Sequence, residues 1–200
     1  VWLKRSRGVG TLGVAEARSW GLSGPVARAA GINCDLRKDE PYCSYEDFDF
    51  EIPVGVIGDV YDRYQVRVQE MVQSSLIIRQ ALRDFPEGEF AVTEELVRRP
   101  DQIQVEQESA SMIHHFKLWM EGHGIQPPPD VDSYMPTESP NGELGFFIVS
   151  DGSDRPYRLR LRAPSFLNYQ LFERMAPGLT LSDALVVLGS FNVVAGEVGR

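Results

Sequence analysis

Cysteine is scarce in this sequence, and its two occurrences form no known metal or redox pattern. Cys34 and Cys43 are the only cysteines among 200 residues. Eight residues separate them and no histidine lies nearby, so they match neither a zinc site nor a CxxC motif. Because free cysteine is among the most buried residue types, we expect two small buried thiols in a reducing compartment.

Basic charge and long apolar runs are also scarce. The chain has 20 Lys and Arg against 29 Asp and Glu, with a sequence pI near 4.9. A nucleic-acid partner would need a concentrated basic surface, so proteins or a neutral small molecule are favoured instead. The longest strongly apolar stretch near the C-terminus, Ala184 to Leu188, is far shorter than the roughly 20 residues that span a bilayer. Any membrane association is therefore expected to come through partners.

The three histidines do not form a convincing metal site. His114 and His115 are adjacent and His123 follows eight residues later. Adjacent positions on a helix point roughly 100° apart, so these imidazoles are not expected to converge on one ion. Ordinary hydrogen-bonded histidines at a helix surface are favoured.

The chain begins with Val1 and shows no signal-peptide layout, so we expect a piece of a longer sequence.

Two amphipathic helices dominate the middle of the chain, which is 42% hydrophobic overall. The first is predicted from Asp59, which can cap it together with Asp62, to about Phe85, ahead of Pro86. Its stripe is spaced alternately three and four residues apart, which places it in a helix bundle: Tyr61, Tyr64, Val68, Met71, Ser75, Ile78, Leu82 and Phe85. The second helix is expected from Glu106 to Glu121, packed antiparallel to the first.

The periodicity changes after three consecutive prolines, Pro127 to Pro129. Alternating segments at 134–139, 143–150 and 157–162 predict a three-stranded antiparallel meander, with Asn141-Gly142 as the first turn. Two short helices, at 166–174 and 181–188, and a final loop complete the chain. The expected fold class is α+β, mainly helical.

A GxGxxG pattern at Gly8 to Gly13 resembles a dinucleotide-binding fingerprint, but its context is wrong. Such a site needs a long unbroken helix after the glycines, whereas Gly21, Gly24 and Pro25 interrupt this segment. We interpret the glycines as tight turns.

Charged clusters elsewhere favour structural roles. Acid and arginine neighbours at 35–38 and 61–64 predict ion pairs that fix a loop and a helix start. The arginines of the last predicted strand, together with Arg155, could meet an acidic partner subunit or an anionic lipid headgroup, or could simply be solvated. No nucleophile with a base and no converging carboxylate pair emerges.

Several motifs, in order along the whole chain, resemble the D-type subunit of NADH-quinone oxidoreductase. The N-terminal ones are Ser23 to Arg28, Asp35 to Lys38, Pro41-Tyr42, Pro53 to Gly55 and Gly58 to Tyr64. The others are Ile113 to Leu118, Gly142 to Gly145, Val149 to Gly152, Arg155 to Arg158, Arg162 to Phe166 and Gly196 to Val198.

The resemblance implies a helix bundle of the nickel-iron hydrogenase large-subunit type with a small antiparallel β-meander. The chain would be the C-terminal half of one such domain. Its expected segments are a loop-rich part at 1–58, long bundle helices at 59–122, the meander at 133–163, and short helices with a C-terminal loop at 164–200.

The resemblance also implies a peripheral subunit on the cytoplasmic face of the bacterial cell membrane. Its partners would be an iron-sulfur subunit of B type, a C-type subunit and membrane-arm subunits. Together they would pass electrons from NADH through iron-sulfur clusters to quinone, coupled to proton translocation. This chain would hold no cofactor and no catalytic residue, because the family's quinone-facing histidine and tyrosine belong to its N-terminal half.

The C-terminal loop is the part that the family uses to line the quinone cavity. The matching positions in this chain are Val194, Ala195, Gly196, Glu197, Val198 and Arg200. Gly196 would let the backbone approach closely. Two departures from the family pattern lie here: Gly199 stands where an aspartate is usual, and Asn192 stands near the place of another. Both changes remove a carboxylate that could pair with Arg200 or carry a proton.

Two other functions stay open. A large subunit of a membrane-bound hydrogenase or formate hydrogenlyase would need soft thiolates, and the C-terminus has no CxxC to supply them. A non-catalytic scaffold paralogue would keep the subunit contacts and lose the quinone chemistry, as Gly199 and Asn192 suggest. The sequence upstream of Val1 would separate the scaffold from the enzyme subunit.

Overall fold

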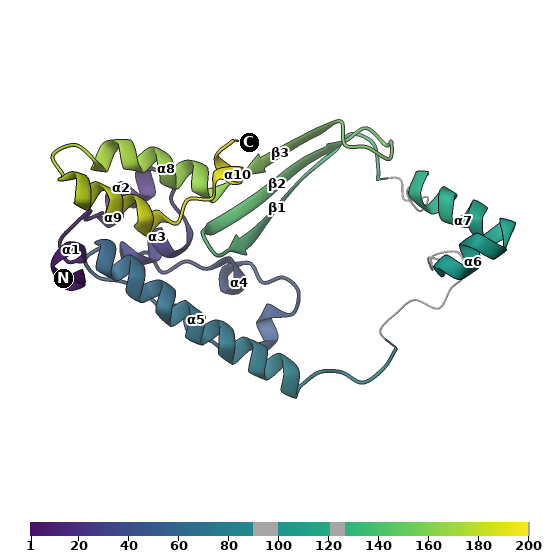
Figure 1. Ribbon diagram of the computed structural model, residues 1–200, viewed down its shortest axis with the longest axis horizontal. Coiled ribbons are helices and arrows are strands. Elements are labelled where there is room, and N and C mark those ends of the chain that lie inside the picture. Colours follow the sequence, from purple (N-terminus) through teal and green to yellow (C-terminus); the bar gives the residue numbers. More distant parts are fainter. Residues whose placement is uncertain (90–99, 121–126, 200) are drawn as a thin grey trace. The chain divides into compact units, whose positions relative to one another are not determined.

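The computed structural model describes residues 1–89, 100–120 and 127–199 (Figure 1). It is mainly helical with one three-stranded antiparallel sheet of order β1-β2-β3, which confirms the predicted α+β class. Residues 1–58 carry only short helices: α1 (Trp2–Ser6), α2 (Val14–Ser19), α3 (Gly24–Ala29), α4 (Leu36–Asp39) and the 3-10 helix η1 (Tyr45–Asp47).

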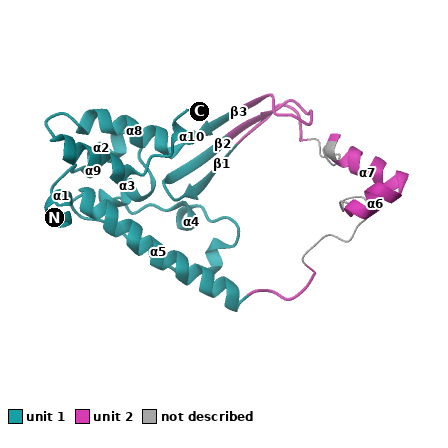
Figure 2. Ribbon diagram, in the orientation of Figure 1, with its two compact units in different colours: residues 1–84, 134–146, 160–200 teal, residues 85–133, 147–159 magenta. Residues whose placement is uncertain are grey.

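The chain forms two compact units (Figure 2). Unit 1 comprises Val1–Asp84, Tyr134–Phe146 and Arg160–Arg200, and unit 2 comprises Phe85–Ser133 and Phe147–Leu159. Unit 1 contains α5 (Val60–Arg83), α8 (Pro164–Met175), α9 (Leu181–Phe191) and α10 (Ala195–Val198). Unit 2 contains α6 (Gln102–Gln107) and α7 (Ser109–Met120).

The hydrophobic core of unit 1 lies where α8 and α9 contact each other and α9 contacts α5 (Figure 1). Leu171, Val187 and Phe191 are completely buried there. They join Leu12 and Val60 and small side chains of α2 and α3 in one cluster. Both C-terminal helices are longer than the predicted 166–174 and 181–188, and the expected final loop includes the single turn of α10.

Helix α5 begins as predicted. The Asp59 carboxylate accepts a hydrogen bond from the Asp62 N–H at 2.8 Å, which caps the first turn. The expected Asp62 ion pair is wrong, because the Asp62 carboxylate accepts from the N–H groups of Val56, Ile57 and Gly58 at 3.0, 2.6 and 3.0 Å. Three backbone donors arranged around one loop satisfy a carboxylate as well as a guanidinium does.

The glycine pattern forms tight turns, as interpreted from the sequence. Gly8 and Gly10 have positive φ angles of 68° and 59°, and the helix that follows Gly13 is only six residues long. The Gly8 N–H donates to the Asp59 carboxylate at 2.7 Å, so this amide serves the cap of α5.

The expected burial of the two thiols is wrong, because Cys34 and Cys43 are both exposed. Cys34 lies in the loop before α4, and Cys43 lies in a turn where its φ angle is 48°. The buried position in this loop belongs to Asp35, which is only 1% exposed and ion-paired with arginine. In this loop the buried side chain is therefore Asp35, which is ion-paired and hydrogen-bonded to arginine, and the two thiols are exposed to solvent.

The sheet consists of β1 (Val131–Ser139), β2 (Gly142–Ser150) and β3 (Arg158–Arg162). The β1–β2 turn is Pro140-Asn141, one residue earlier than predicted. Gly24 and Gly142 approach so closely here that a Cβ on Gly24 would lie 2.3 Å from the Gly142 Cα. The hairpin is therefore held against the start of α3 by a contact that excludes any side chain.

In unit 2 the single helix predicted at 106–121 is divided into two. Glu108 adopts extended backbone angles between α6 and α7. An Asp101 capping box starts α6 inside the segment expected to be a connection, and most of that segment lies outside the described residues. The expected stop at Gly122 and Gly124 also lies outside them, and the antiparallel packing of α5 with the second helix stays a prediction.

Candidate functional site

The C-terminal segment, residues 192–199, leaves α9 through a left-handed residue and returns onto the start of α8. Asn192 ends α9 with φ 53° and ψ 51°. The Val194 N–H then donates to Ser165 Oγ at 3.2 Å, and the Ser165 N–H donates to Glu197 Oε2 at 3.1 Å. Ser165 is completely buried. Buried Ser165 therefore accepts one hydrogen bond from the segment and donates another to it, and the two bonds together fix the position of the segment.

Asn141 of the hairpin turn provides a second attachment. Its side-chain oxygen accepts from Asn192 Nδ2 at 2.8 Å, and its carbonyl oxygen accepts from Asn168 Nδ2 at 3.3 Å. Asn141 and Asn168 are buried. The turn between β1 and β2 is thereby tied to both C-terminal helices, at the residue where the segment begins.

Two arginines of α5 hold the end of α9. Arg63 Nε donates to Ser190 Oγ at 2.8 Å, and Arg67 Nη1 donates to the Ser190 carbonyl at 2.7 Å. Arg67 Nη2 donates to the Phe191 carbonyl at 3.3 Å. These bonds satisfy carbonyl groups that a helix end leaves without partners. Burial lowers the pKa of Arg63 to about 10, so its guanidinium is still charged at neutral pH.

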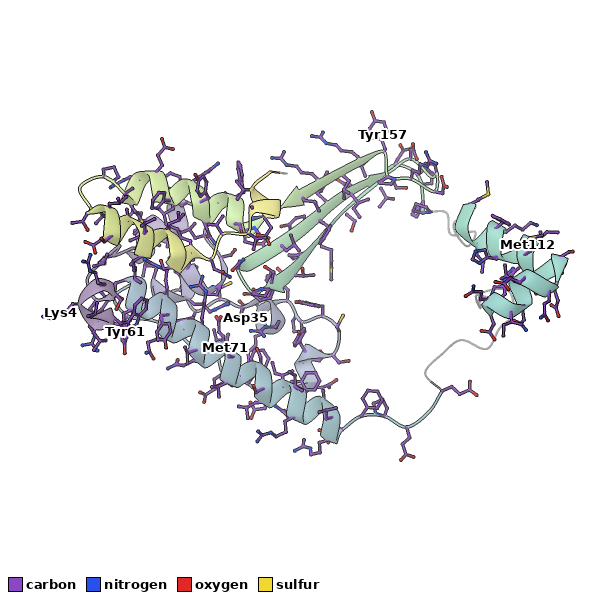
Figure 3. All side chains as sticks on the ribbon, in the orientation of Figure 1. Lys4, Asp35, Tyr61, Met71, Met112 and Tyr157 are labelled. Atoms are coloured by element: carbon purple, nitrogen blue, oxygen red, sulfur yellow. The ribbon has the colours of Figure 1, made fainter. Side chains whose placement is uncertain are left out.

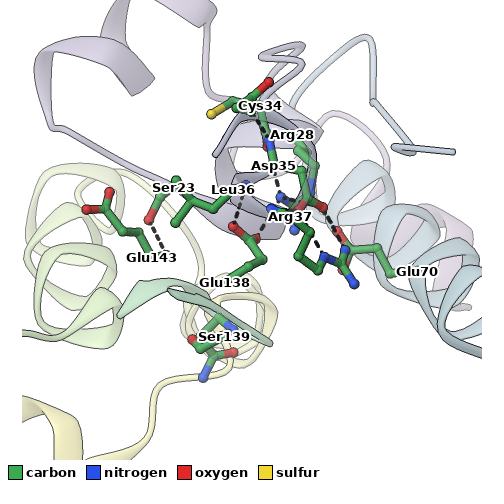
Figure 4. Close-up of polar contacts among 12 residues, drawn as sticks. Ser23, Arg28, Cys34, Asp35, Leu36, Arg37, Glu70, Glu138, Ser139 and Glu143 are labelled. Atoms are coloured by element: carbon green, nitrogen blue, oxygen red, sulfur yellow. Dashed lines mark hydrogen bonds and ion pairs between the residues drawn. The ribbon is translucent and has the colours of Figure 1, made fainter. Parts of the chain in front are cut away.

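A buried ionic cluster lies beside these arginines and centres on Arg28 of α3 (Figure 4). Arg28 Nε lies 2.7 Å from Glu70 of α5, and Arg28 Nη1 lies 2.8 Å from Glu138 of β1 and 3.7 Å from Asp35. Arg37 pairs with Asp35 through two hydrogen bonds of 2.9 and 2.6 Å, as predicted for this loop. The cluster therefore joins α3, α4, α5 and β1.

The carboxylates of the cluster differ in their pKa shifts. Burial raises the pKa of Glu70 and of Glu138, because removing each carboxylate from water outweighs its attraction to Arg28. Burial also opposes ionisation of Asp35, but the hydrogen bonds and charge of Arg37, with the charge of Arg28, lower the pKa of that group. Asp35 is thus the anchored anion, whereas the two glutamates hold their charge less firmly.

Two hollows of unit 1 meet at Asn192, Arg67 and Met71. The first has a volume of about 440 Å³ and is lined by the cluster residues Arg28, Arg37, Glu70 and Glu138, with Ser74, Ser139 and Pro140. The second has about 480 Å³ and is mainly apolar, lined by Trp2, Val60, Tyr64, Val68, Val186, Gly189 and Ser190. A charged hollow and an apolar one thus meet where the C-terminal segment starts.

Comparison with known proteins matches the whole chain. The family described as "Respiratory-chain NADH dehydrogenase, 49 Kd subunit" covers residues 1–200. The chain belongs to this family. It is 42% identical over 200 residues to the D subunit of NADH-quinone oxidoreductase from Wolbachia pipientis subsp. Culex pipiens, and 44% identical to that of Anaplasma marginale. Each match covers 100% of this chain and 50% of the relative, so the chain spans about half the length of these relatives.

The expected cavity residues of this family member lie at the surface of unit 1. The side chain of Val194 is 44% exposed, Ala195 and Gly196 are exposed, and Glu197 and Val198 are half-buried. Arg200 lies outside the described residues. Of the described C-terminal segment, only Asn192 lines the two hollows. Within the 200 residues, residues 194–198 therefore form an open face, and their role as a cavity wall stays a prediction.

The two departures from the family pattern have different surroundings. Gly199 is exposed after α10 and has an ordinary φ angle of -86°. Asn192 donates to the buried Asn141 oxygen, which a carboxylate at the same position could not do. The chain therefore has a specific use for an amide at position 192.

Sequence reasoning missed several residues of this site. Glu138 lies near the end of a strand, and Ser165 and Asn168 look like ordinary helix residues. Their partners are distant in sequence, such as Arg28 for Glu138. A usable signal was the grouping of Arg63, Arg67 and Glu70 on one side of α5, since charged residues on a face that packs against the protein need partners.

The described ranges contain neither a group of metal ligands nor a membrane-crossing helix. No group of three or more His, Cys, Asp or Glu there is placed to hold a metal ion. His114 and His115 lie on α7, and His123 falls outside the described ranges. Within the same ranges, no helix has the length and apolar character needed to cross a membrane.

Proposed function

We propose that the chain is half of a D-type subunit polypeptide of respiratory NADH-quinone oxidoreductase, and that residues 194–200 form part of the wall of its quinone chamber. A B-type partner would hold the iron-sulfur cluster that delivers electrons from NADH. A C-type partner and membrane-arm subunits would complete a complex on the cytoplasmic face of the bacterial membrane. Quinone reduction would be coupled there to proton translocation.

The observation that carries this proposal is the way the C-terminal segment is held. Ser165 and Asn141, both buried, fix its backbone and its first side chain through the hydrogen bonds given above. Its apolar side chains at Val194 and Ala195 nevertheless remain exposed. A rigid segment with uncovered apolar groups suits contact with an apolar ligand or a partner chain.

The chemistry of the described residues supports a binding role for this chain in the proposed chamber. Most polar groups near the segment are already engaged: two nitrogens of Arg67 donate to carbonyl groups of α9, and Arg28 pairs with carboxylates. Among the described residues, the buried Arg67 Nε has no hydrogen-bond partner. Electron transfer would belong to clusters on a partner. The chain would supply shape, an apolar surface and a fixed charge pattern that positions the quinone headgroup relative to that cluster.

Enlarging one exposed side chain tests this proposal in the assembled complex. Ala195→Trp is expected to raise the KM for quinone about tenfold, because the indole would occupy space in the chamber. NADH oxidation by a water-soluble acceptor that bypasses the chamber should be unchanged. Leu185→Trp, on an exposed position of α9 (62% exposed), is the matched control and should leave both activities unchanged.

Equal KM values for the two variants would contradict the chamber assignment. The alternatives from the sequence have their own outcomes. An assembled complex that reduces no quinone would favour the scaffold, and nickel in the purified complex would favour the hydrogenase-like subunit.

A further inference from the structure

The ionic cluster of unit 1 contains more carboxylates than cations (Figure 4). Among the described residues, its ion pairs join the carboxylates of Asp35, Glu70 and Glu138 to the guanidinium groups of Arg28 and Arg37. Fully ionised, these groups carry three negative and two positive charges, a net charge of -1. An uncompensated charge is costly to remove from water, so such a cluster favours the binding of one proton.

The hydrogen bonds show which carboxylate is best placed to hold that proton. Both oxygens of Asp35 and both oxygens of Glu138 accept hydrogen bonds. Glu70 accepts through Oε1, from Arg28 Nε at 2.7 Å, and among the described residues its second oxygen accepts none. The second oxygen of Glu70 can therefore carry a proton without the loss of a hydrogen bond.

Glu70 also has the most open position of the three carboxylates. Its side chain is 16% exposed, against 6% for Glu138 and 1% for Asp35. It lines the charged hollow of about 440 Å³, which is large and polar enough to hold several water molecules. The lining residues of this hollow all belong to unit 1, so the placement of Glu70 in it does not depend on unit 2.

We propose that Glu70 is a proton-exchanging carboxylate that passes protons from solvent toward the quinone chamber, an inference that rests on the proposed function. Reduction of a quinone to a quinol adds two electrons, which the cluster of the partner would deliver, and two protons, which come from solvent. One of these protons would pass through Glu70. Its carboxyl group releases the proton to water in the hollow, and the resulting carboxylate regains one from solvent.

The charged hollow adjoins the start of the C-terminal segment. Arg67, Asn192 and Met71, the last of which is labelled in Figure 3, line this hollow and the apolar one. Arg67 donates to the carbonyl group of Phe191, which directly precedes Asn192. Glu70 follows Arg67 by about one helical turn on α5. A proton released by Glu70 therefore enters the space beside the segment that is proposed to line the chamber.

The charges around Glu70 oppose one another. Burial raises the pKa of Glu70, the positive charges of Arg28 and Arg67 oppose that rise, and the negative charge of Glu138 adds to it. Because Glu70 and Glu138 contact the same guanidinium group, the protonation of one changes the proton affinity of the other. A group held in this balance can both release and regain a proton.

Infrared spectroscopy of the assembled complex tests whether Glu70 binds a proton. A protonated carboxyl group has a C=O stretching band that an ionised one lacks, so Glu70→Gln should remove one such band from the pH-difference spectrum. Glu138→Gln should keep the band and move its midpoint to lower pH, because the charge of Glu138 no longer raises the pKa of Glu70. Both variants retain an oxygen that can accept from Arg28.

Two spectroscopic results would overturn the proposal, whatever the outcome for the chamber. A band that survives in Glu70→Gln and disappears in Glu138→Gln would assign the proton to Glu138. Identical spectra for the unmodified complex and Glu70→Gln would show that Glu70 stays ionised.

Quinone reduction by the assembled complex tests the use of that proton. Glu70→Gln should lower kcat about tenfold and remove the alkaline decline that loss of the Glu70 proton causes, with the KM for quinone unchanged. Glu70→Asp keeps a titratable carboxyl group and should retain the alkaline decline. Glu173→Gln, at an exposed position of α8, is the matched control and should change neither quantity. NADH oxidation by a water-soluble acceptor should be equal in all three variants.

The two kinetic quantities separate this proposal from the chamber assignment. A raised KM in Ala195→Trp with an unchanged kcat and pH profile in Glu70→Gln would support the chamber and overturn the proton route. An unchanged KM in Ala195→Trp with the expected loss in Glu70→Gln would support the proton route and remove residues 194–200 from the chamber wall.

Discussion

The two units of this chain differ in what holds them together. Every hydrophobic side chain that is buried among the described residues lies in unit 1, including Leu171, Val187 and Phe191. The α7 side chains Met112 and Phe116 of unit 2 are 42% and 55% exposed. Unit 1 thus carries its own core, whereas the described part of unit 2 relies on local helix and strand contacts. A family that works in an assembly can keep one part of a polypeptide self-supporting and leave another to be covered.

The ionic cluster strengthens this contrast, because it too lies entirely in unit 1. Removing its central cation should have the largest effect on stability. Arg28→Ala would leave Glu70 and Glu138 buried without their partner, and we expect unit 1 to lose about 3–5 kcal/mol of unfolding free energy. Segment-resolved hydrogen exchange should show the loss in α3, α5 and α8 and little change in α7.

Arg83→Ala is the control for Arg28→Ala, because the Arg83–Asp84 pair is exposed on both sides. Exposed pairs contribute little, so this variant should leave the unfolding free energy nearly unchanged. Similar losses in the two variants would show that the Arg28 cluster is not the buried centre described above.

A matched pair of leucines tests the core itself. Leu171→Ala removes a completely buried side chain of unit 1 and should cost about 2–5 kcal/mol. Leu159→Ala removes a side chain of unit 2 that is 52% exposed and should cost less than about 0.5 kcal/mol. Urea unfolding of both variants checks the difference, and a large loss for Leu159→Ala would mean that unit 2 has a core after all.

The stability of unit 1 should depend on pH through the buried glutamates of the ionic cluster. Burial raises the pKa of Glu138 above 4.5, so its contribution to stability is complete below that value and decreases as the pH rises through the folded-state pKa. The stability advantage of the unmodified chain over Glu138→Gln should therefore shrink from pH 4.5 toward neutrality.

For Asp35→Asn, the stability difference from the unmodified chain should change with pH in the opposite direction. The lowered pKa of Asp35 adds stability that is present above 3.8 and is lost as the pH falls through the folded-state pKa. The advantage of the unmodified chain over this variant should grow as the pH rises to 3.8. Denaturant titrations at a series of pH values measure both slopes, and slopes of the same sign would refute the assignment.

Much of the fold was predictable because its signals are local. The Asp59 cap and the alternating strands depend on neighbours in sequence, and the structure has both. The break at Glu108 was missed because the helical pattern of 106–121 continues through it. The hairpin turn was misplaced by one residue because Asn-Gly is a strong turn signal, whereas Gly142 is used here for its close approach to Gly24.

The candidate site was less predictable because it is built from distant residues. The chain positions that meet at Arg28 span 110 residues, from Arg28 to Glu138. Periodicity predicted the apolar stripe of α5 as its buried face, and Glu70 lies off that stripe, so the sequence indicated neither its burial nor its partner. The C-terminal segment was found by resemblance, whereas its attachments to Ser165 and Asn141 required the three-dimensional arrangement.

The smallest expected effect on stability concerns Gly196. A Cβ at this position would have no atom within 4 Å, and its φ angle is not positive, so the isolated chain has no structural need for glycine there. Gly196→Ala should leave the unfolding free energy unchanged or raise it by up to about 1 kcal/mol, because α10 becomes less costly to order. Gly24→Ala is the contrasting variant, since its Cβ would lie 2.3 Å from Gly142 Cα, and it should be strongly destabilising. If residues 194–200 line the quinone chamber, Gly196→Ala should nevertheless raise the KM for quinone in the assembled complex. A loss of stability above about 1 kcal/mol without a change in KM would instead assign Gly196 to packing inside unit 1.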